Sequence, residues 1–250
     1  MTFFQRVTGV IRFGLCFAVL SVGSIFLIII LILLIPWRVT RIRVANKWGH
    51  TIGPMILWVS GVKVNFPTRE QLDKDRPAIY LSNHSSELDP ILALKLCPIG
   101  GCGISKKQIV RVPFFGQAYL LSGHLLIDRS SREKAIASMK EVAALVRKHQ
   151  LSIWIWPEGT RSSDGKLLPF KKGFVHLALE TKLPIVPVVN HGADKCFPAR
   201  TLRLTPGTVD IEILPTIDTS EWKKETIDEH IAEVRNMYLR ALQPNENLAL

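Results

Sequence analysis

A histidine and an aspartate, His84 and Asp89, stand five residues apart in the segment SNHSSELDP at 82–90. On a regular helix they would point about 140° apart and could not act together. Asp89 precedes Pro90, which disfavours helical backbone at Asp89 and makes Pro90 a suitable first helical residue. We therefore expect a turn in which the carboxylate reaches the imidazole, fixes its tautomer and leaves the other ring nitrogen as a general base. The alternative is that Asp89 only caps a helix and His84 is a solvated loop residue.

A second polar segment, WPEGTRS at 156–162, follows an apolar run that is typical of a strand. Loops at the carboxyl ends of strands are the usual place for a binding site in an open α/β sheet. The planar guanidinium of Arg161 matches two oxygens of a phosphate group. The segment therefore indicates a phosphate site, and the alternative is a charged surface turn.

Weaker candidates lie between and after these segments. Lys106, Lys107 and Arg129 could add cationic groups to one pocket, although lysine pairs are more often simply solvated. In Leu183–Val189, two prolines bracket a short apolar run, for which we expect a buried strand with a structural role.

Taken together and in this order, these segments resemble the motifs of the lysophosphatidate acyltransferase family, the 1-acylglycerol-3-phosphate O-acyltransferases. The four matching motifs are histidine-x4-aspartate at 83–89, glycine with Ile-Asp-Arg at 123 and 127–129, Pro-Glu-Gly-Thr-Arg-Ser at 157–162, and the proline-rich strand at 183–189. The resemblance covers roughly residues 75–190 and points to Lys106 rather than Lys107 as the motif lysine. Trp156 stands where the family commonly has Phe, and Ser85 where Gln is frequent.

The resemblance implies transfer of an acyl group from acyl-CoA or acyl-carrier protein to the sn-2 hydroxyl of lysophosphatidate, which gives phosphatidate in phospholipid biosynthesis. His84 would be the base and Asp89 its support, and no metal or other cofactor is implied. The implied substrate-binding residues are Lys106, Arg129, Glu158, Gly159, Thr160 and Arg161. Two alternatives remain: an acyltransferase for glycerol 3-phosphate or another lysophospholipid, and a non-catalytic lipid-binding protein on a membrane.

The elements that must position these residues alternate from about residue 70 onward. Apolar runs predict strands, and capping-box patterns at 130–133 and 226–229 predict the starts of two helices, with a third at Pro90–Leu96. The predicted strands are Ala78–Ser82, His124–Asp128, Ser152–Trp156, Ile185–Val189 and Val209–Leu214. This alternation predicts an α/β fold with a mostly parallel central sheet flanked by helices. We assign residues 63–250 to this catalytic domain and expect the chain to stay folded when residues 1–36 are deleted.

The N-terminal part predicts a membrane-embedded helical segment over residues 1–62. Phe13–Trp37 contains no charged residue and is long enough to cross a bilayer, whereas a cleaved signal peptide fits poorly because no cleavage pattern follows. The family resemblance implies an alternative, in which this helix and the next one are embedded together in one leaflet. Trp37–Val62 alternates apolar and basic positions at helical spacing. We interpret this stretch as an interfacial helix broken near Pro54, with a surface helix of the globular domain as the alternative.

Charge distinguishes the same two parts of the 250-residue chain. Residues 1–69 hold eight basic and no acidic side chains, whereas the rest holds 24 basic and 21 acidic ones. Because the excess lies beside a membrane segment, it indicates an anionic phospholipid surface rather than nucleic acid as partner. The basic cluster after Trp37 predicts a cytoplasmic catalytic domain, at the inner membrane in a bacterium or at an endoplasmic-reticulum-type membrane in a eukaryote. Four cysteines without paired spacing indicate a reducing compartment.

Overall fold

The structure is a computed structural model that describes residues 3–127 and 132–243. A seven-stranded sheet has the order β1-β7-β6-β2-β5-β3-β4. Five neighbouring strands run parallel, and β7 pairs antiparallel with β6, so that β7 and its parallel neighbour β1 run the other way. The strands are β1 Val62–Asn65, β2 Ile79–Ser82, β3 Gly101–Lys106, β4 Leu125–Ile127, β5 Ser152–Ile155, β6 Ile185–His191 and β7 Gly207–Ile213. The mostly parallel α/β fold expected from the sequence is confirmed.

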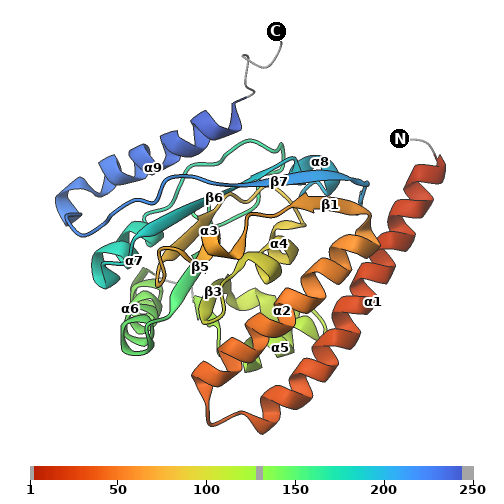
Figure 1. The fold of residues 1–250 in the computed structure, drawn as a ribbon, viewed down its shortest axis with the longest axis horizontal. Helices are drawn as coiled ribbons and strands as arrows, with labels where there is room; N and C mark the ends of the chain where they lie inside the picture. Colours follow the sequence, from red (N-terminus) through yellow and green to blue (C-terminus); the bar gives the residue numbers. More distant parts are fainter. Residues whose placement is uncertain (1–2, 128–131, 244–250) are drawn as a thin grey trace.

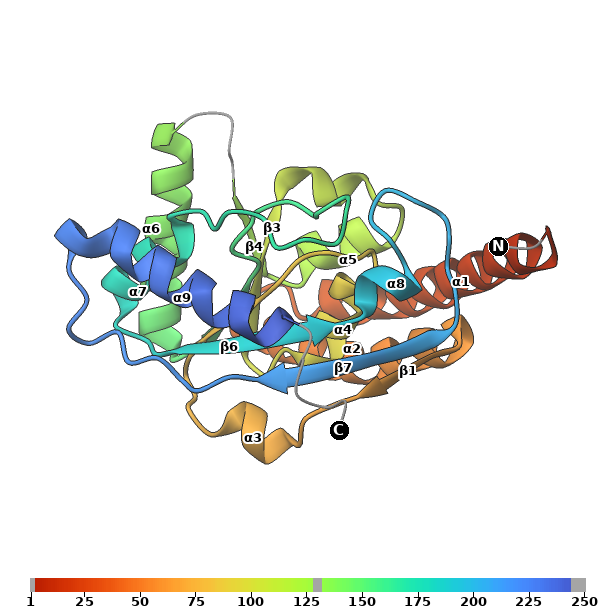
Figure 2. The same ribbon diagram turned by 90° about the horizontal axis from the view of Figure 1, so that it is seen from above.

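Helices cover both faces of this sheet (Figures 1 and 2). α1, α2, α4 and α5 lie on one side, and α6, α7 and α9 lie on the other. The helices are α1 Phe3–Leu33, α2 Arg38–Ser60, α3 Arg69–Asp73, α4 Asp89–Leu96, α5 Phe115–Leu121, α6 Arg132–His149, α7 Gly173–Thr181, α8 Ala193–Cys196 and α9 Ile227–Leu242. Each face of the sheet therefore has its own hydrophobic cluster.

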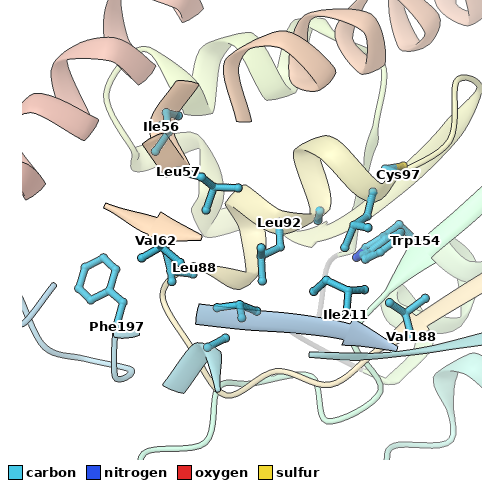
Figure 3. Close-up of a cluster of buried hydrophobic side chains, with 14 of the residues drawn as sticks. Ile56, Leu57, Val62, Leu88, Leu92, Cys97, Trp154, Val188, Phe197 and Ile211 are labelled. Carbon is cyan, nitrogen blue, oxygen red and sulfur yellow. The ribbon is translucent and has the colours of Figure 1, made fainter. Parts of the chain in front are cut away.

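Alternation along the strands assigns side chains to the two clusters. In β2, Tyr80 packs towards α4, whereas Ile79 and Leu81 pack towards α7 and α9. Figure 3 shows the first cluster, in which Leu92 of α4 lies above the sheet, between Leu57 of α2 and the strands. This packing fixes α4, and with it the first turn of that helix, against the carboxyl end of β2.

Two strands, β1 and β3, were not expected from the sequence pattern. β3 contains two glycines and ends in Lys106, a composition that indicates a loop when it is considered alone. It forms a strand because β5 pairs with its first half and β4 with its second half. The hydrogen-bonded pairing of β3 with β4 and β5 outweighs the low intrinsic preference of this segment for a strand.

The two N-terminal helices lie side by side and antiparallel along one side of the molecule (Figure 1). The predicted break near Pro54 is wrong, because α2 continues through it to Ser60. Packing against α4 explains the continuity: the backbone at Gly49 comes so close that an added Cβ would lie 2.8 Å from the carbonyl oxygen of Leu94. Ile52 and Ile56 of α2 are buried in the cluster of Figure 3, whereas Trp58 is 83% exposed.

The final helix, α9, begins at Ile227 and buries Val234 and Tyr238, as its apolar spacing predicts. The capping box expected at 226–229 is wrong, because the Thr226 side chain makes no cap bond. The three residues before the helix form a 3₁₀ turn, and the Thr226 hydroxyl donates to the carbonyl of Lys223 instead. The first two positions of the other predicted box, 130 and 131, lie outside the described residues.

Candidate active site

His84 and Asp89 meet at the carboxyl end of β2. His84 Nδ1 lies 2.7 Å from Asp89 Oδ2, and the same oxygen accepts the backbone N–H groups of Ser85 and Ser86 at 2.8 and 2.9 Å. The predicted turn is confirmed, with one difference: Asp89 itself is the first residue of α4, followed by Pro90. Its carboxylate therefore closes the turn and holds the imidazole at once.

The pair is shielded, and the neighbouring strand reinforces it. The side chain of His84 is 11% exposed and that of Asp89 is fully buried. The Asn190 amide of β6 donates to Asp89 Oδ1 at 3.4 Å, and Asn83 exchanges hydrogen bonds with the Asn190 backbone at 2.8 and 3.1 Å. Because Nδ1 faces a carboxylate, it carries the hydrogen, and Nε2 keeps a lone pair. The sequence analysis did not identify Asn190, although a buried amide at the end of a strand is a usable signal.

The second motif holds the histidine from another side. The Trp156 ring stacks on the His84 ring, with centroids 4.6 Å apart and an interplanar angle of 18°. Glu158 Oε1 accepts the backbone N–H of His84 at 3.0 Å, and the Ser162 N–H donates to the His84 carbonyl at 3.0 Å. The segment after β5 therefore clamps the backbone of the candidate base.

Glu158 is buried behind the histidine and does not line the adjacent cavity. Burial raises the pKa of its carboxyl from 4.5 to about 7, an effect opposed chiefly by the hydrogen bond from the His84 N–H. Its second oxygen, Oε2, has no hydrogen-bond partner among the described residues. The structure thus separates Glu158 from the other expected substrate-binding residues and places it against the catalytic turn.

A cavity of about 500 Å³ opens beside His84. One group of its polar lining residues comes from the carboxyl edge of the sheet, and we call this part the polar end of the cavity: Lys106 ends β3, and Gly159, Thr160 and Arg161 follow β5. Most of the apolar lining residues come from α1, α2, α4, α5 and the segment between β3 and α5, and we call this part the apolar end. Its lining there includes Leu27, Ala45, Trp48, Ala93, Leu94, Ile109, Val112, Phe115 and Ala118.

Arg200 and His124 are among the cavity residues that were not expected from the sequence. Arg200, on the loop after α8, lines the polar end, and no local motif marked it. His124 lines the cavity as well, and burial lowers its pKa to about 4, so that it is neutral near pH 7. The Gly103 N–H donates to His124 Nδ1 at 3.2 Å, which leaves the hydrogen on Nε2.

The remaining expected residues divide between site and scaffold. Gly123 has φ +84° beside Arg38, whose Nε donates to the Gly123 carbonyl at 3.1 Å, so it joins α2 to the sheet. Leu183–Val189 contains the first part of β6 and is structural, as expected. Arg129 lies outside the described residues. In residues 3–127 and 132–243, no group of three or more His, Cys, Asp or Glu gathers as a candidate metal site.

Comparisons with known proteins identify the family of this chain. A sequence model described as Acyltransferase matches residues 63–191. The chain is 39% identical over 243 residues to a 1-acyl-sn-glycerol-3-phosphate acyltransferase of Limnanthes douglasii, with 97% of this chain and 86% of that one covered. It is 37% identical over 191 residues to the Escherichia coli protein of that name, which covers 76% of each chain.

A solved structure shares the fold. The crystal structure of PlsC, the 1-acyl-sn-glycerophosphate acyltransferase from Thermotoga maritima, matches with a TM-score of 0.78 and 24% identity, over 96% of both chains. The motifs, the site that they form and the extent of these matches place this chain in the 1-acyl-sn-glycerol-3-phosphate acyltransferase family of enzymes.

Proposed function

We propose that this protein transfers a fatty acyl group from a thioester to the sn-2 hydroxyl of lysophosphatidate and so forms phosphatidate. The observation that carries the proposal is the His84–Asp89 pair beside a cavity with a cationic end and a largely apolar end. An acceptor with a phosphate and a long acyl chain has the same two chemical parts. The names of the relatives support this choice of acceptor.

The reaction needs one base and no covalent enzyme intermediate. His84 Nε2 takes the proton of the acceptor hydroxyl while the hydroxyl oxygen attacks the thioester carbonyl carbon. The tetrahedral intermediate then expels the thiolate, which takes the proton back from the imidazolium. The Asp89 carboxylate, 2.7 Å from Nδ1, stabilises the imidazolium between these steps.

In this proposal the acceptor phosphate binds at the polar end of the cavity. Arg161 and Lys106 supply positive charge there, and Gly159 and Thr160 shape the wall. Arg129 is assigned to the same site by the family motif alone. Glu158 acts indirectly, through the backbone of His84.

The thioester donor is acyl-CoA or acyl-carrier protein. Both carry the acyl group on the same phosphopantetheine thiol, and the largely apolar end of the cavity provides room for a fatty acyl chain. Parallel assays with the two donors and equal acyl chains separate them. A large difference in kcat/KM identifies the donor that the surface outside the cavity recognises.

We further propose that residues 1–62 hold the 63–250 domain against an anionic membrane. By length and composition, α1 can cross a bilayer over Arg6–Leu33, and side chains such as Phe26 and Leu33 are exposed. The basic residues of α2 favour the cytoplasmic side. In a bacterium this is the inner membrane, and in a eukaryote a membrane of the endoplasmic reticulum type.

The deciding experiment is an acyl-transfer assay with the purified full-length protein in mixed micelles. Labelled acyl thioester is offered with lysophosphatidate, glycerol 3-phosphate or lysophosphatidylcholine. We expect phosphatidate as the main product of the wild-type protein. The His84→Ala variant should form almost none. A higher kcat/KM for glycerol 3-phosphate or for lysophosphatidylcholine would assign a different acceptor, and equal binding without turnover would indicate a lipid-binding protein.

A further inference from the structure

The cavity proposed to receive an anionic acceptor contains an acidic side chain. Among the described residues that line it, Glu87 is the one carboxylate, beside three cationic side chains, those of Lys106, Arg161 and Arg200. Glu87 lies in the catalytic turn, two residues before Asp89. A carboxylate repels a phosphate dianion, so Glu87 is an unfavourable residue in the wall of a phosphate site unless it has another role.

Both carboxylate oxygens of Glu87 have partners in the cavity wall. Oε2 lies 3.1 Å from Nη1 of Arg161, and Oε1 accepts the backbone N–H of Arg200 at 2.9 Å. The Arg161 and Glu87 side chains are 33% and 24% exposed, so the pair can be reached from solvent. Glu87 therefore occupies donors that an incoming anion would use.

Arg161 keeps unused hydrogen-bonding capacity in this arrangement. Its ion pair with Glu87 runs through one terminal nitrogen, and its buried Nε has no acceptor among the described residues. A guanidinium carries five N–H donors in a fork that fits two oxygens of a phosphate. A phosphate that replaced the carboxylate would place two oxygens on this fork, whereas Glu87 contacts one terminal nitrogen.

The loop that carries Arg200 is fastened to the same turn. The Ser86 hydroxyl lies 2.9 Å from the Ala193 carbonyl and 2.7 Å from the Phe197 carbonyl, and the Glu87 N–H donates to the Phe197 carbonyl at 3.1 Å. These bonds do not involve the Glu87 carboxylate. The loop therefore stays attached to the turn when that carboxylate moves away.

We propose that Glu87 is a specificity-determining residue: it occupies the anion-binding donors of Arg161 and Arg200 until the acceptor phosphate displaces it. The inference rests on the proposed role of Arg161. A phosphate monoester carries about −1.5 to −2 charges at pH 7, whereas a carboxylate carries one. A monoester therefore competes with Glu87 better than a singly charged phosphodiester does, and Glu87 favours lysophosphatidate over lysophospholipids with larger headgroups.

The test is Glu87→Gln in the full-length enzyme, because the amide keeps the size of the side chain and removes its charge. KM is measured in mixed micelles for lysophosphatidate, and KM or the competitive inhibition constant for lysophosphatidylcholine. We expect the constants of both lipids to fall, and the constant for lysophosphatidylcholine to fall further than the KM for lysophosphatidate. The preference for lysophosphatidate should therefore shrink about tenfold. A raised KM for lysophosphatidate, or an unchanged preference, would overturn the inference.

Two further variants separate the possible failures. Glu180→Gln removes an exposed ion pair with Arg147, 3.7 Å long and away from the cavity lining, and is the matched control that should change neither constant. Arg161→Ala should raise KM for lysophosphatidate and cancel most of the Glu87→Gln effect in the double variant. An unchanged KM in Arg161→Ala would overturn the proposed phosphate site and this inference with it. A raised KM there, with an unaltered preference in Glu87→Gln, would overturn the inference alone.

Discussion

At the scale of single residues, contacts with other residues fix both the ring and the backbone of the candidate base, His84. Asp89 binds the ring nitrogen of His84, Trp156 stacks on the ring, and Glu158 with Ser162 binds the backbone. Nε2 is the ring atom left for the substrate. Such positioning matters because a displacement of about 1 Å can cost about 100-fold in rate.

The first prediction concerns Asp89→Asn. The amide keeps the shape of the side chain but cannot stabilise the imidazolium that forms during the reaction, so we expect kcat to fall about 10³-fold. Steady-state assays measure this, and circular dichroism confirms folding. Asp228→Asn, which removes a surface pair with Lys172, is the control and should keep full activity. Near-normal kcat in folded Asp89→Asn would contradict the role of the pair.

The second prediction concerns Glu158 and pH. Its pKa is raised from 4.5 to about 7 by burial, so the native state holds a proton that the unfolded chain has lost between these values. The contribution of Glu158 to stability is therefore fully present below pH 4.5 and is lost as pH rises through about 7, a loss of about 3 kcal/mol for this group. Denaturation of wild type and Glu158→Gln in one detergent should show free energies of unfolding that diverge over this range. Parallel pH profiles would contradict the prediction.

At the scale of elements, close backbone contact explains why α2 continues past Pro54. Gly49 and Gly53 face α4, and α2 also bonds to the loop before β3: the Asn46 side chain accepts from the Gly100 N–H at 2.9 Å and donates to the Gly101 carbonyl at 3.1 Å. Arg41 adds a hydrogen bond to the Leu121 carbonyl at the end of α5. α2 thus connects the N-terminal region to the elements that line the cavity.

The third prediction tests the contact between α2 and α4 with Gly49→Ala. The added methyl would lie 2.8 Å from the Leu94 carbonyl oxygen, which belongs to the backbone and cannot turn aside. We expect a loss of about 1–3 kcal/mol, measured as a lower Tm in detergent. Gly14→Ala in α1 is the matched control, since its added methyl would meet no heavy atom within 4 Å apart from the adjacent backbone of its own helix. Equal Tm values for the two variants would show that α2 and α4 have room to separate.

At the scale of the whole molecule, the N-terminal helices share clusters with the rest of the chain. Leu27 and Leu31 of α1 are buried with Ala45 and Ala118, and Cys16 belongs to the cluster of Figure 3. Leu27 also lines the cavity. The apolar helix α1, with one side buried against the rest of the chain, therefore completes the wall of the candidate active site.

The fourth prediction concerns deletion of residues 1–36. The local pattern predicts that the α/β part folds without them, but the shared clusters lead us to expect a lower Tm and aggregation outside detergent. Size-exclusion chromatography and thermal denaturation in detergent measure both, against the full-length protein. A monomeric truncated protein with the full-length Tm would show that α1 serves the membrane alone.

The sequence by itself determined what depends on neighbouring residues. The spacing of His84 and Asp89 and the proline after Asp89 set a turn that closes within a few residues, and apolar periodicity marked the strands β2, β5 and β6. Such features need only local contacts. They also sufficed to indicate the family.

The tertiary structure decided what joins distant parts of the chain. Because β2 lies between β5 and β6, the turn at His84 meets Glu158 on one side and Asn190 on the other, and the loop after α8 brings Arg200 to Glu87. Periodicity describes which face of an element is apolar, but strand order selects which polar ends become neighbours. For that reason the sequence analysis assigned Glu158 to the acceptor and did not identify Glu87 or Arg200, whereas the order of the strands places Glu158 behind the base and Glu87 against Arg161.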